Sequence, residues 1–334
     1  MKHFNLSDFT HGGAARAAGI AFAATGVLCL SLTGAAQAAN TDEQLHATWQ
    51  QSLAHTPVLG EGCFAAKYPS TKWTQVACKT APDIRYLPAS GPQGFTVGDG
   101  NDFAGKVSGL LASAEGSFPK VKDLKTETND GASNTYSLQL NSQFFASPAC
   151  AGAANPANCL GWLQFILSQG GGDDVFMQYW LINYDTTCPA GWNTFSPDCY
   201  KNSAAVGAPL QPLKDFKKLK LTGSAVSGGN DTVMVTTYNN AYSVSGNDNV
   251  VGLAGFWDES EFNVIGNGGG SQADFNAGTK LTVQIDLDNG TTTAPTCESH
   301  AGTTGETNNL NLGTCTAAGG ATPSISFTES LAKK

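Results

Sequence analysis

Two neighbouring stretches of alternating residues, 162–168 and 175–184, constrain the fold of this chain most. Side chains on a β-strand point to opposite faces with a period of two, and both stretches are apolar on both faces. The residues between them, 169–174, are the glycines and short acids that reverse a chain. The sequence therefore predicts two adjacent strands in the middle of a layered structure.

Each of these predicted strands carries one glutamine in its middle, Gln164 in the first and Gln178 in the second. A buried amide without hydrogen-bond partners costs about 1–3 kcal/mol. The two glutamines are therefore either parts of a structural network or the floor of a site, and the sequence leaves both readings open. Trp180 shares the predicted face of Gln178 and is expected to wall any cleft there.

From residue 134 onward the pattern is nearly all strand, interrupted by turns rich in Gly, Asn and Asp. We expect further strands at 136–141, 219–226, 231–238, 249–256, 259–265, 280–287 and 324–328. Strands at this spacing predict an all-β domain, a sandwich of two antiparallel sheets that covers residues 126–330.

Residues 39–125 have a different character and are expected to form an N-terminal extension that packs on the sandwich. Its best helix is predicted for residues 41–53, with Thr41 and Gln44 as a capping box. Leu45, Trp49 and Leu53 then share one face. Whether this extension is removed as a prosegment is left open by the sequence.

The first 38 residues have the features of a secretory signal peptide. Lys2, His3 and Arg16 give a basic start, residues 19–32 form an apolar run, and Ala36 and Ala38 form a small-x-small cleavage site. The apolar run has 14 residues, too few to span a bilayer. We therefore expect a secreted or periplasmic protein with no membrane association after the signal is removed.

Nine cysteines agree with export, because one of them lies in the predicted signal and eight remain. Eight cysteines allow 105 pairings. Pairing of nearest neighbours is the simplest, since each pair closes a short loop. The predicted disulfides are Cys63–Cys78, Cys150–Cys159, Cys188–Cys199 and Cys297–Cys315. Such bonds persist in oxidising compartments.

Charge and histidine content exclude several functions. The chain has 27 acidic against 18 basic residues, which disfavours nucleic-acid binding. Histidines are few and no Gly-x-Ser-x-Gly motif is present, so we expect neither a serine triad nor a metal or other cofactor. Carboxylates and amides remain as candidates. Glu259 and Glu261 share a strand face, and apolar neighbours should raise the pKa of such an acid.

The order of these features resembles the eqolisins, the glutamic peptidases of fungi and bacteria. The likeness lies in the Trp162 strand, the strand around Gln178 and the acid strand around Glu261, with Phe275 fourteen residues further on. It covers roughly residues 134–287. The resemblance implies a lectin-like (concanavalin-type) sandwich, and a catalytic dyad of Gln178 and Glu261 that cleaves peptide bonds at acid pH.

In the mechanism that this resemblance implies, ionised Glu261 takes a proton from the attacking water and Gln178 donates to the oxyanion. Both are expected to face each other across a groove open to solvent, with Gln164 and Glu259 as secondary candidates. The substrate would be a polypeptide and the protein a monomer. The alternatives are a glycan-binding module without catalysis, using exposed Trp192, Tyr200 and Trp257, and a structural protein.

Overall fold

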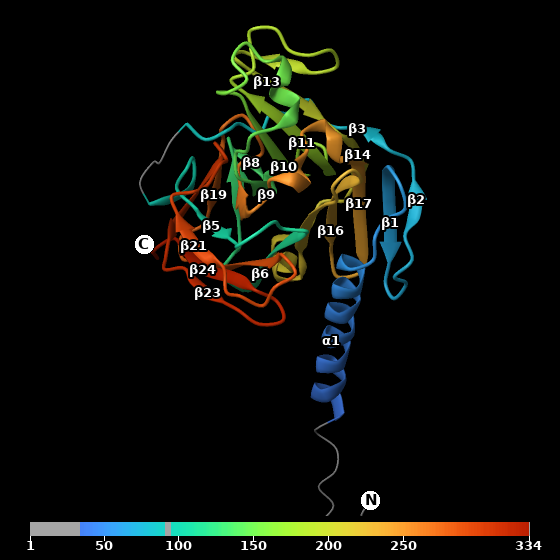
Figure 1. Cartoon of the computed structure of the whole chain (residues 1–334). Helices are drawn as coiled ribbons and strands as arrows, with labels where there is room; N and C mark the ends of the chain where they lie inside the picture. Colours follow the sequence, from blue (N-terminus) through green and yellow to red (C-terminus); the bar gives the residue numbers. More distant parts are fainter. Residues whose placement is uncertain (1–33, 91–94, 334) are drawn as a thin grey trace, which may run out of the picture. The chain divides into compact units, whose positions relative to one another are not determined.

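The computed structural model describes residues 34–90 and 95–333 of the chain (Figure 1). The chain divides into two units, residues 1–42 and residues 43–334. The α-helix α1 (Gly34–Ala54) begins in the first unit and ends in the second. Most of the predicted signal peptide lies outside the described residues, so it stays a prediction. Within the described ranges, no helix has the length and apolar character needed to cross a membrane.

Helix α1 is longer than the sequence pattern predicted. Its backbone is already helical at Thr41, so the capping box predicted there is wrong. Trp49 and Leu53 are buried as expected, whereas Leu45 is about half exposed. His46 is buried instead, stacked between two tyrosine rings whose centroids both lie 3.8 Å from the imidazole. The buried face of the helix is therefore partly polar, which the apolar periodicity could not reveal.

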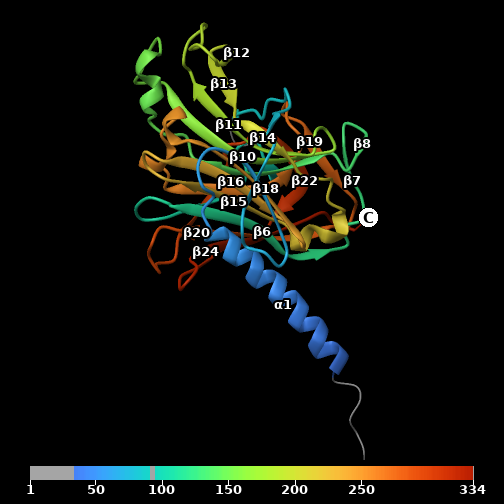
Figure 2. The same cartoon turned by 90° about the vertical axis from the view of Figure 1, so that its right-hand side faces the viewer.

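In the described part of the chain, the larger sheet has fourteen strands. Its main order, part of which Figure 2 shows, is β2 (Thr74–Val76), β1 (Gly62–Lys67), β17 (Asn240–Asn247), β16 (Asn230–Thr236), β15 (Lys220–Ala225), β6 (Ser113–Lys122), β20 (Lys280–Asp288), β24 (Ser324–Ser330), β22 (Thr307–Leu312), β19 (Gln272–Phe275), β7 (Glu127–Asn129) and β8 (Ala132–Ser133). Two further strands join it at the side, β4 (Thr96–Gly98) on β22 and β23 (Thr316–Ala318) on β24. All of its pairs are antiparallel except the parallel pair β19–β22.

The second sheet has ten strands among the described residues. Its main order is β12 (Asn193–Phe195), β13 (Asp198–Asn202), β11 (Asp174–Ile182), β10 (Leu160–Gln169), β9 (Tyr136–Ser142), β18 (Glu259–Ile265), β5 (Phe103–Lys106) and β21 (Thr296–Ser299). β14 (Ala204–Gly207) pairs with β11 and with β3 (Lys79–Thr80). Strands β10 and β11 are the predicted neighbours and pair from Leu160 to Ile182, which confirms the central hairpin.

Short 3-10 helices connect some of these strands. They are η1 (Pro148–Gly152), η2 (Leu213–Lys218), η3 (Asp248–Val250) and η4 (Leu253–Gly255). The last two replace the strand predicted for residues 249–256, which is wrong. Gly252 has a φ of 75°, a left-handed conformation that does not occur in a regular strand. The chain therefore turns here, and the apolar residues on either side of Gly252 are buried as parts of this turn.

The main hydrophobic core lies between the two sheets and confirms the predicted sandwich. Phe262 on β18 and Phe165 on β10 are fully buried in this core. Each ring lies over a glycine of the facing sheet, Gly116 on β6 and Gly223 on β15. A Cβ at Gly116 would lie 2.0 Å from the Phe262 ring, so this position requires a residue without a side chain.

Gly116→Ala is therefore expected to destabilise the protein by about 1–3 kcal/mol, because an added methyl group overpacks the core. Urea unfolding followed by tryptophan fluorescence measures the change. Gly255→Ala is the matched control, since a Cβ there meets nothing within 4 Å. Equal midpoints for the two variants would contradict this account of the interface between the sheets.

The sandwich begins earlier in the chain than the expected boundary at residue 125. Strand β5 lies between β18 and β21 in one sheet, and β6 lies between β15 and β20 in the other. Residues 103–122 are thus integral strands of both sheets. Strand β1 also pairs with β17, so the sheets include parts of the expected extension from Gly62 onward.

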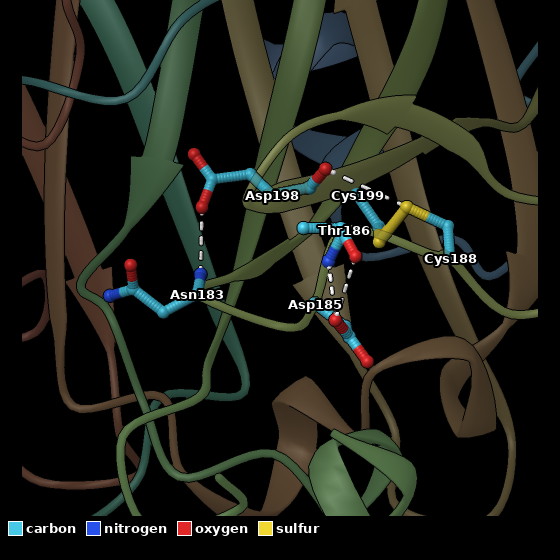
Figure 3. Close-up of a disulfide and its surroundings, with 6 residues drawn as sticks. All are labelled: Asn183, Asp185, Thr186, Cys188, Asp198 and Cys199. Atoms are coloured by element: carbon cyan, nitrogen blue, oxygen red, sulfur yellow. Dashed lines mark hydrogen bonds between the residues drawn. A yellow bond between two sulfur atoms is a disulfide. The ribbon is translucent and has the colours of Figure 1, made fainter. Parts of the chain in front are cut away.

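All four predicted disulfides are present: Cys63–Cys78, Cys150–Cys159, Cys188–Cys199 and Cys297–Cys315. Figure 3 shows the third, where the Asp198 carboxylate accepts a hydrogen bond from the Asn183 backbone N–H at 2.7 Å beside the bridge. Each bond closes a loop of 9 to 18 residues. Four disulfides favour an oxidising compartment.

Candidate functional site

A row of polar side chains crosses the second sheet at right angles to its strands. The register places Gln178 opposite both Asn202 and Gln164, then Gln164 opposite Asn141, and Asn141 opposite Glu261. Residues directly opposite each other in a sheet project from the same face. We call these five residues, which come from β13, β11, β10, β9 and β18, the polar row. It lies on the outer face of the sheet, because the alternate residues of the same strands fill the core.

Hydrogen bonds link the polar row from one end to the other. Asn141 Nδ2 donates to Glu261 Oε1 at 3.0 Å and to Gln139 Oε1 at 3.1 Å. Gln164 Nε2 donates to the same Gln139 oxygen at 2.9 Å. The indole N–H of Trp180 then joins Gln164 Oε1 at 3.0 Å to Gln178 Oε1 at 3.1 Å. The two residues of the predicted dyad are therefore connected, but only through four other side chains.

Gln178 and Glu261 do not face each other across a groove. Three strand spacings separate their backbones, which is about 14 Å. Both are also buried, Gln178 fully and Glu261 with 3% of its surface exposed, so the predicted open cleft is absent here. The amide that lies next to Glu261 belongs to Asn141. Its other atom, the buried Oδ1, has no hydrogen-bond partner, which is rare for a buried polar group.

Glu261 is held by donors but still has a raised pKa. Thr303 donates to it twice, from the backbone N–H to Oε2 at 2.7 Å and from the hydroxyl to Oε1 at 3.1 Å. Burial nevertheless raises the pKa of Glu261 to about 7, because the loss of hydration outweighs these hydrogen bonds. The crevice beside it, lined by Ser142, Glu259 and Thr303, is too narrow for a water molecule. The carboxyl group can thus change its protonation state near neutral pH.

An irregular segment, residues 82–89, lies over the polar row and is called the covering segment below. At one end Asn202 Nδ2 donates to the Pro82 carbonyl at 3.1 Å. In the middle Gln178 donates to the Ile84 carbonyl at 2.9 Å and accepts from the Tyr86 N–H at 2.8 Å. These contacts show that the outer face of this sheet binds a polypeptide backbone through the amide of Gln178.

The other end of the polar row is covered by residues 301–306. The Ala89 N–H donates to the Thr303 carbonyl at 2.8 Å, and Thr303 in turn bonds Glu261. Fully buried Glu306 accepts from the Leu87 N–H at 2.9 Å and from Gln139 at 3.3 Å. Burial raises the pKa of Glu306 as well. From Gln178 to Glu261 the polar row is thus closed from solvent, whereas Asn202 at its other end is partly exposed.

The remaining predicted residues divide between this face and the core. Trp180 contacts both glutamines, as its strand position predicted. Glu259 is partly exposed and pairs with Lys106 at 3.3 Å. Trp257 is fully buried in the core, with its ring 5.6 Å from that of Phe165, so its predicted binding role is wrong.

The aromatic platform expected for glycan binding is not formed by the predicted residues. Tyr200 is 6% exposed and packs on Trp180 at 5.3 Å between ring centroids, and Trp257 lies in the core. Trp192 alone of the three is partly exposed. The three rings therefore offer no common surface on which sugar rings could stack.

Sequence reasoning missed Asn141, Gln139 and Glu306. The signal for the first two was present, because residues 136–142 read as a strand with amides in alternate positions, the pattern that drew attention to Gln164. Glu306 lies in a loop, where no periodicity marks a residue as buried. The covering segment was also missed, since its contacts join residues as far apart as Leu87 and Glu306.

Fold and site together define a disulfide-bonded β-sandwich protein with a covered polar row on one outer sheet face. No protein-family model and no curated protein sequence matches the chain. Among solved structures, it is similar to scytalido-glutamic peptidase bound to a transition state analogue inhibitor, with 10% identity and a TM-score of 0.24 over 73% of this chain and 98% of the other. SCP-B, an eqolisin-family peptidase in complex with the tripeptide Ala-Ile-His, aligns with 9% identity, the same TM-score of 0.24 and the same coverage. So low a score transfers no role from their residues to these.

Proposed function

We propose that this protein is a secreted or periplasmic peptidase that acts at acid pH and is described here in a covered, latent form. The observation that carries the proposal is the covering segment itself. A stretch of polypeptide lies along a row of amides that ends at a protonatable carboxyl group, and its backbone is bonded to that row. A face that recognises backbone N–H and C=O groups suits a peptide substrate better than a sugar.

In this proposal Glu261 is the general base. Ionised, it takes a proton from a water molecule as the water oxygen attacks the carbonyl carbon of the scissile bond. It then returns the proton to the leaving nitrogen as the C–N bond breaks, which gives a carboxylic acid and an amine. Asn141 orients the water through its free Oδ1. Gln178 instead holds the substrate backbone, as it holds the covering segment.

For this chemistry residues 301–306 have to move, because the crevice that they line beside Glu261 admits no water. The covering segment has to move as well, because it occupies the hydrogen bonds of Gln178 that the substrate backbone would use. Tyr86 is fully buried and anchors the covering segment. Tyr86→Ala is therefore expected to loosen the cover and to increase cleavage of an acid-denatured polypeptide at pH 4–6, measured by mass spectrometry of the products.

Glu261→Gln in the same Tyr86→Ala background is the control, and it should show no cleavage. If the Glu261→Gln variant still cleaves the polypeptide, a residue other than Glu261 is the general base. Folded Tyr86→Ala protein that cleaves nothing between strongly and mildly acidic pH would contradict the proposed function.

A further inference from the structure

We propose that the groove under the covering segment selects a tyrosine side chain of the polypeptide that it binds. This inference rests on the proposed function, in which a polypeptide takes the place of the covering segment. The selecting element is the pocket that Tyr86 fills, which lies beside Gln178 on the outer face of β10 and β11.

The walls of this pocket are apolar and its floor is a hydrogen-bond acceptor. Ile166, Phe176 and Ala205 surround the buried Tyr86 ring, with the Phe176 ring centroid at 6.0 Å. The Tyr86 hydroxyl donates to Asn267 Oδ1 at 2.7 Å. A phenylalanine ring would fit the same walls but would lose the hydrogen bond to Asn267 Oδ1, which is partly exposed and keeps Ser168 as its other donor.

The orientation of Asn267 is fixed by other contacts. Its Nδ2 donates to the Gln169 carbonyl at 3.2 Å, and its Oδ1 accepts from the Ser168 hydroxyl at 2.9 Å. The amide therefore presents its oxygen, not its nitrogen, to whatever enters the pocket. None of these contacts involves the covering segment, so the floor of the pocket is built by the body of the protein.

The neighbouring contacts read the backbone and ignore side-chain identity. Gln178 bonds the carbonyl of Ile84 and the N–H of Tyr86. The Gly269 N–H donates to the Arg85 carbonyl at 2.6 Å, and the Gly305 N–H donates to the Leu87 carbonyl at 2.7 Å. The Arg85 side chain is exposed. Any peptide could make these backbone contacts. Among the side chains, Ile84 and Leu87 pack on the sheet but stay partly exposed, so the pocket of the fully buried Tyr86 is the most selective contact.

The test measures peptide binding to the full chain carrying Tyr86→Ala, which empties the pocket. The probe is a fluorescent peptide with the sequence of residues 83–88, compared with versions that carry phenylalanine or alanine in place of the tyrosine. Fluorescence anisotropy should show the tyrosine peptide binding about three- to tenfold more tightly than the phenylalanine peptide, since the phenylalanine peptide lacks the hydrogen bond to the partly exposed Asn267 Oδ1. The alanine peptide should bind more weakly still.

Asn267→Leu added to Tyr86→Ala provides the matched control, because it removes the acceptor and keeps the pocket closed at its floor. It should abolish the preference for tyrosine over phenylalanine. Equal binding of all three peptides to folded Tyr86→Ala protein, or no binding of any, would overturn the inference. A preference for tyrosine that persists in Asn267→Leu would do the same.

Should Tyr86→Ala fail to fold, Tyr86→Phe replaces it, since the ring that packs on Phe176 is kept. The covering segment is then held without its hydroxyl contact, and the tyrosine peptide should bind Tyr86→Phe more tightly than wild type. Equal binding to the two proteins overturns the inference. Binding without cleavage would support the tyrosine pocket and count against the peptidase; cleavage without tyrosine preference would do the reverse.

Discussion

Replacing Glu261 with glutamine is expected to abolish peptide hydrolysis and to make the protein more stable at pH 8. The activity should fall by about 10²–10⁴-fold, the contribution of a general base. Stability should rise because the variant removes a carboxyl group whose pKa burial raises to about 7, and which therefore loses its proton inside the fold at pH 8. Glutamine keeps the size and shape of the side chain.

Two measurements check this pair of effects, the rate of product formation at pH 5 in the Tyr86→Ala background and the melting temperature at pH 8. The matched control is Glu115→Gln on the other sheet, a partly exposed carboxylate paired with Lys220. Glu115→Gln should neither lower the rate of product formation nor raise the melting temperature at pH 8. A Glu261→Gln protein that melts lower than wild type at pH 8 would show that the ionised carboxylate stabilises the fold.

The second large effect is a loss of stability as pH rises from about 4.5 to 8. Six carboxyl groups with raised pKa values are buried, and in the described part of the chain none pairs with lysine or arginine: Asp102, Glu127, Asp231, Glu261, Glu306 and Glu329. Burial is the main cause in each case. Asn263 Nδ2 bonds two of them, Asp102 at 2.8 Å and Glu329 at 2.6 Å, which brings two acids together.

The sign follows from proton binding. Because the folded pKa values lie above the unfolded ones, the folded state holds more protons in this pH range and stability falls as pH rises. The shift of Glu261 from 4.5 to about 7 alone amounts to about 3 kcal/mol, and that corresponds to a fall in Tm on the order of 10 °C. Thermal unfolding between pH 4 and pH 8 measures it, and Glu261→Gln should flatten the curve. A Tm that is constant or rising over this range would contradict the prediction.

These two predictions together define a working range. Glu261 has to be ionised to act as a base, and exposure to solvent would bring its pKa back toward the ordinary value for glutamate. The fold is expected to be most stable below that value. Activity should therefore peak in mildly acidic solution, where an uncovered carboxylate is ionised and the other buried acids keep their protons.

The fold could be predicted from the sequence where the alternation of side chains along a strand indicated which segments form strands. Strands β10 and β11 were predicted from alternation alone, and β18 was predicted with its bounds. Strand β17 was missed, because Ser243 and Ser245 hide a buried strand behind small polar residues. Each disulfide joins two cysteines that follow one another in the sequence, so the pairing could be predicted from their spacing alone.

The candidate site was predictable only in part, and the reason is physical. Period-two alternation gives the face on which Gln178 and Glu261 lie, but not the number of strands between them. That number depends on the order β11–β10–β9–β18, in which β9 comes before β10 in the chain and β18 long after. The cover over the row depends on contacts between residues such as Leu87 and Glu306, 219 positions apart, which no local pattern encodes.

The locality of the four disulfides has a consequence for the covering segment. One bond lies wholly before residue 82 and the other three lie wholly after residue 149, so no disulfide spans the segment. A single cut within residues 82–89 would leave two polypeptides with no covalent link. Strand β1 would still hold the first piece, because it pairs with β17 over six residues from Gly62 to Lys67. One cut in the covering segment would therefore convert the protein into a short N-terminal chain and a longer C-terminal chain that stay associated without a covalent bond. The peptide bonds that now join the two parts pass over the candidate site.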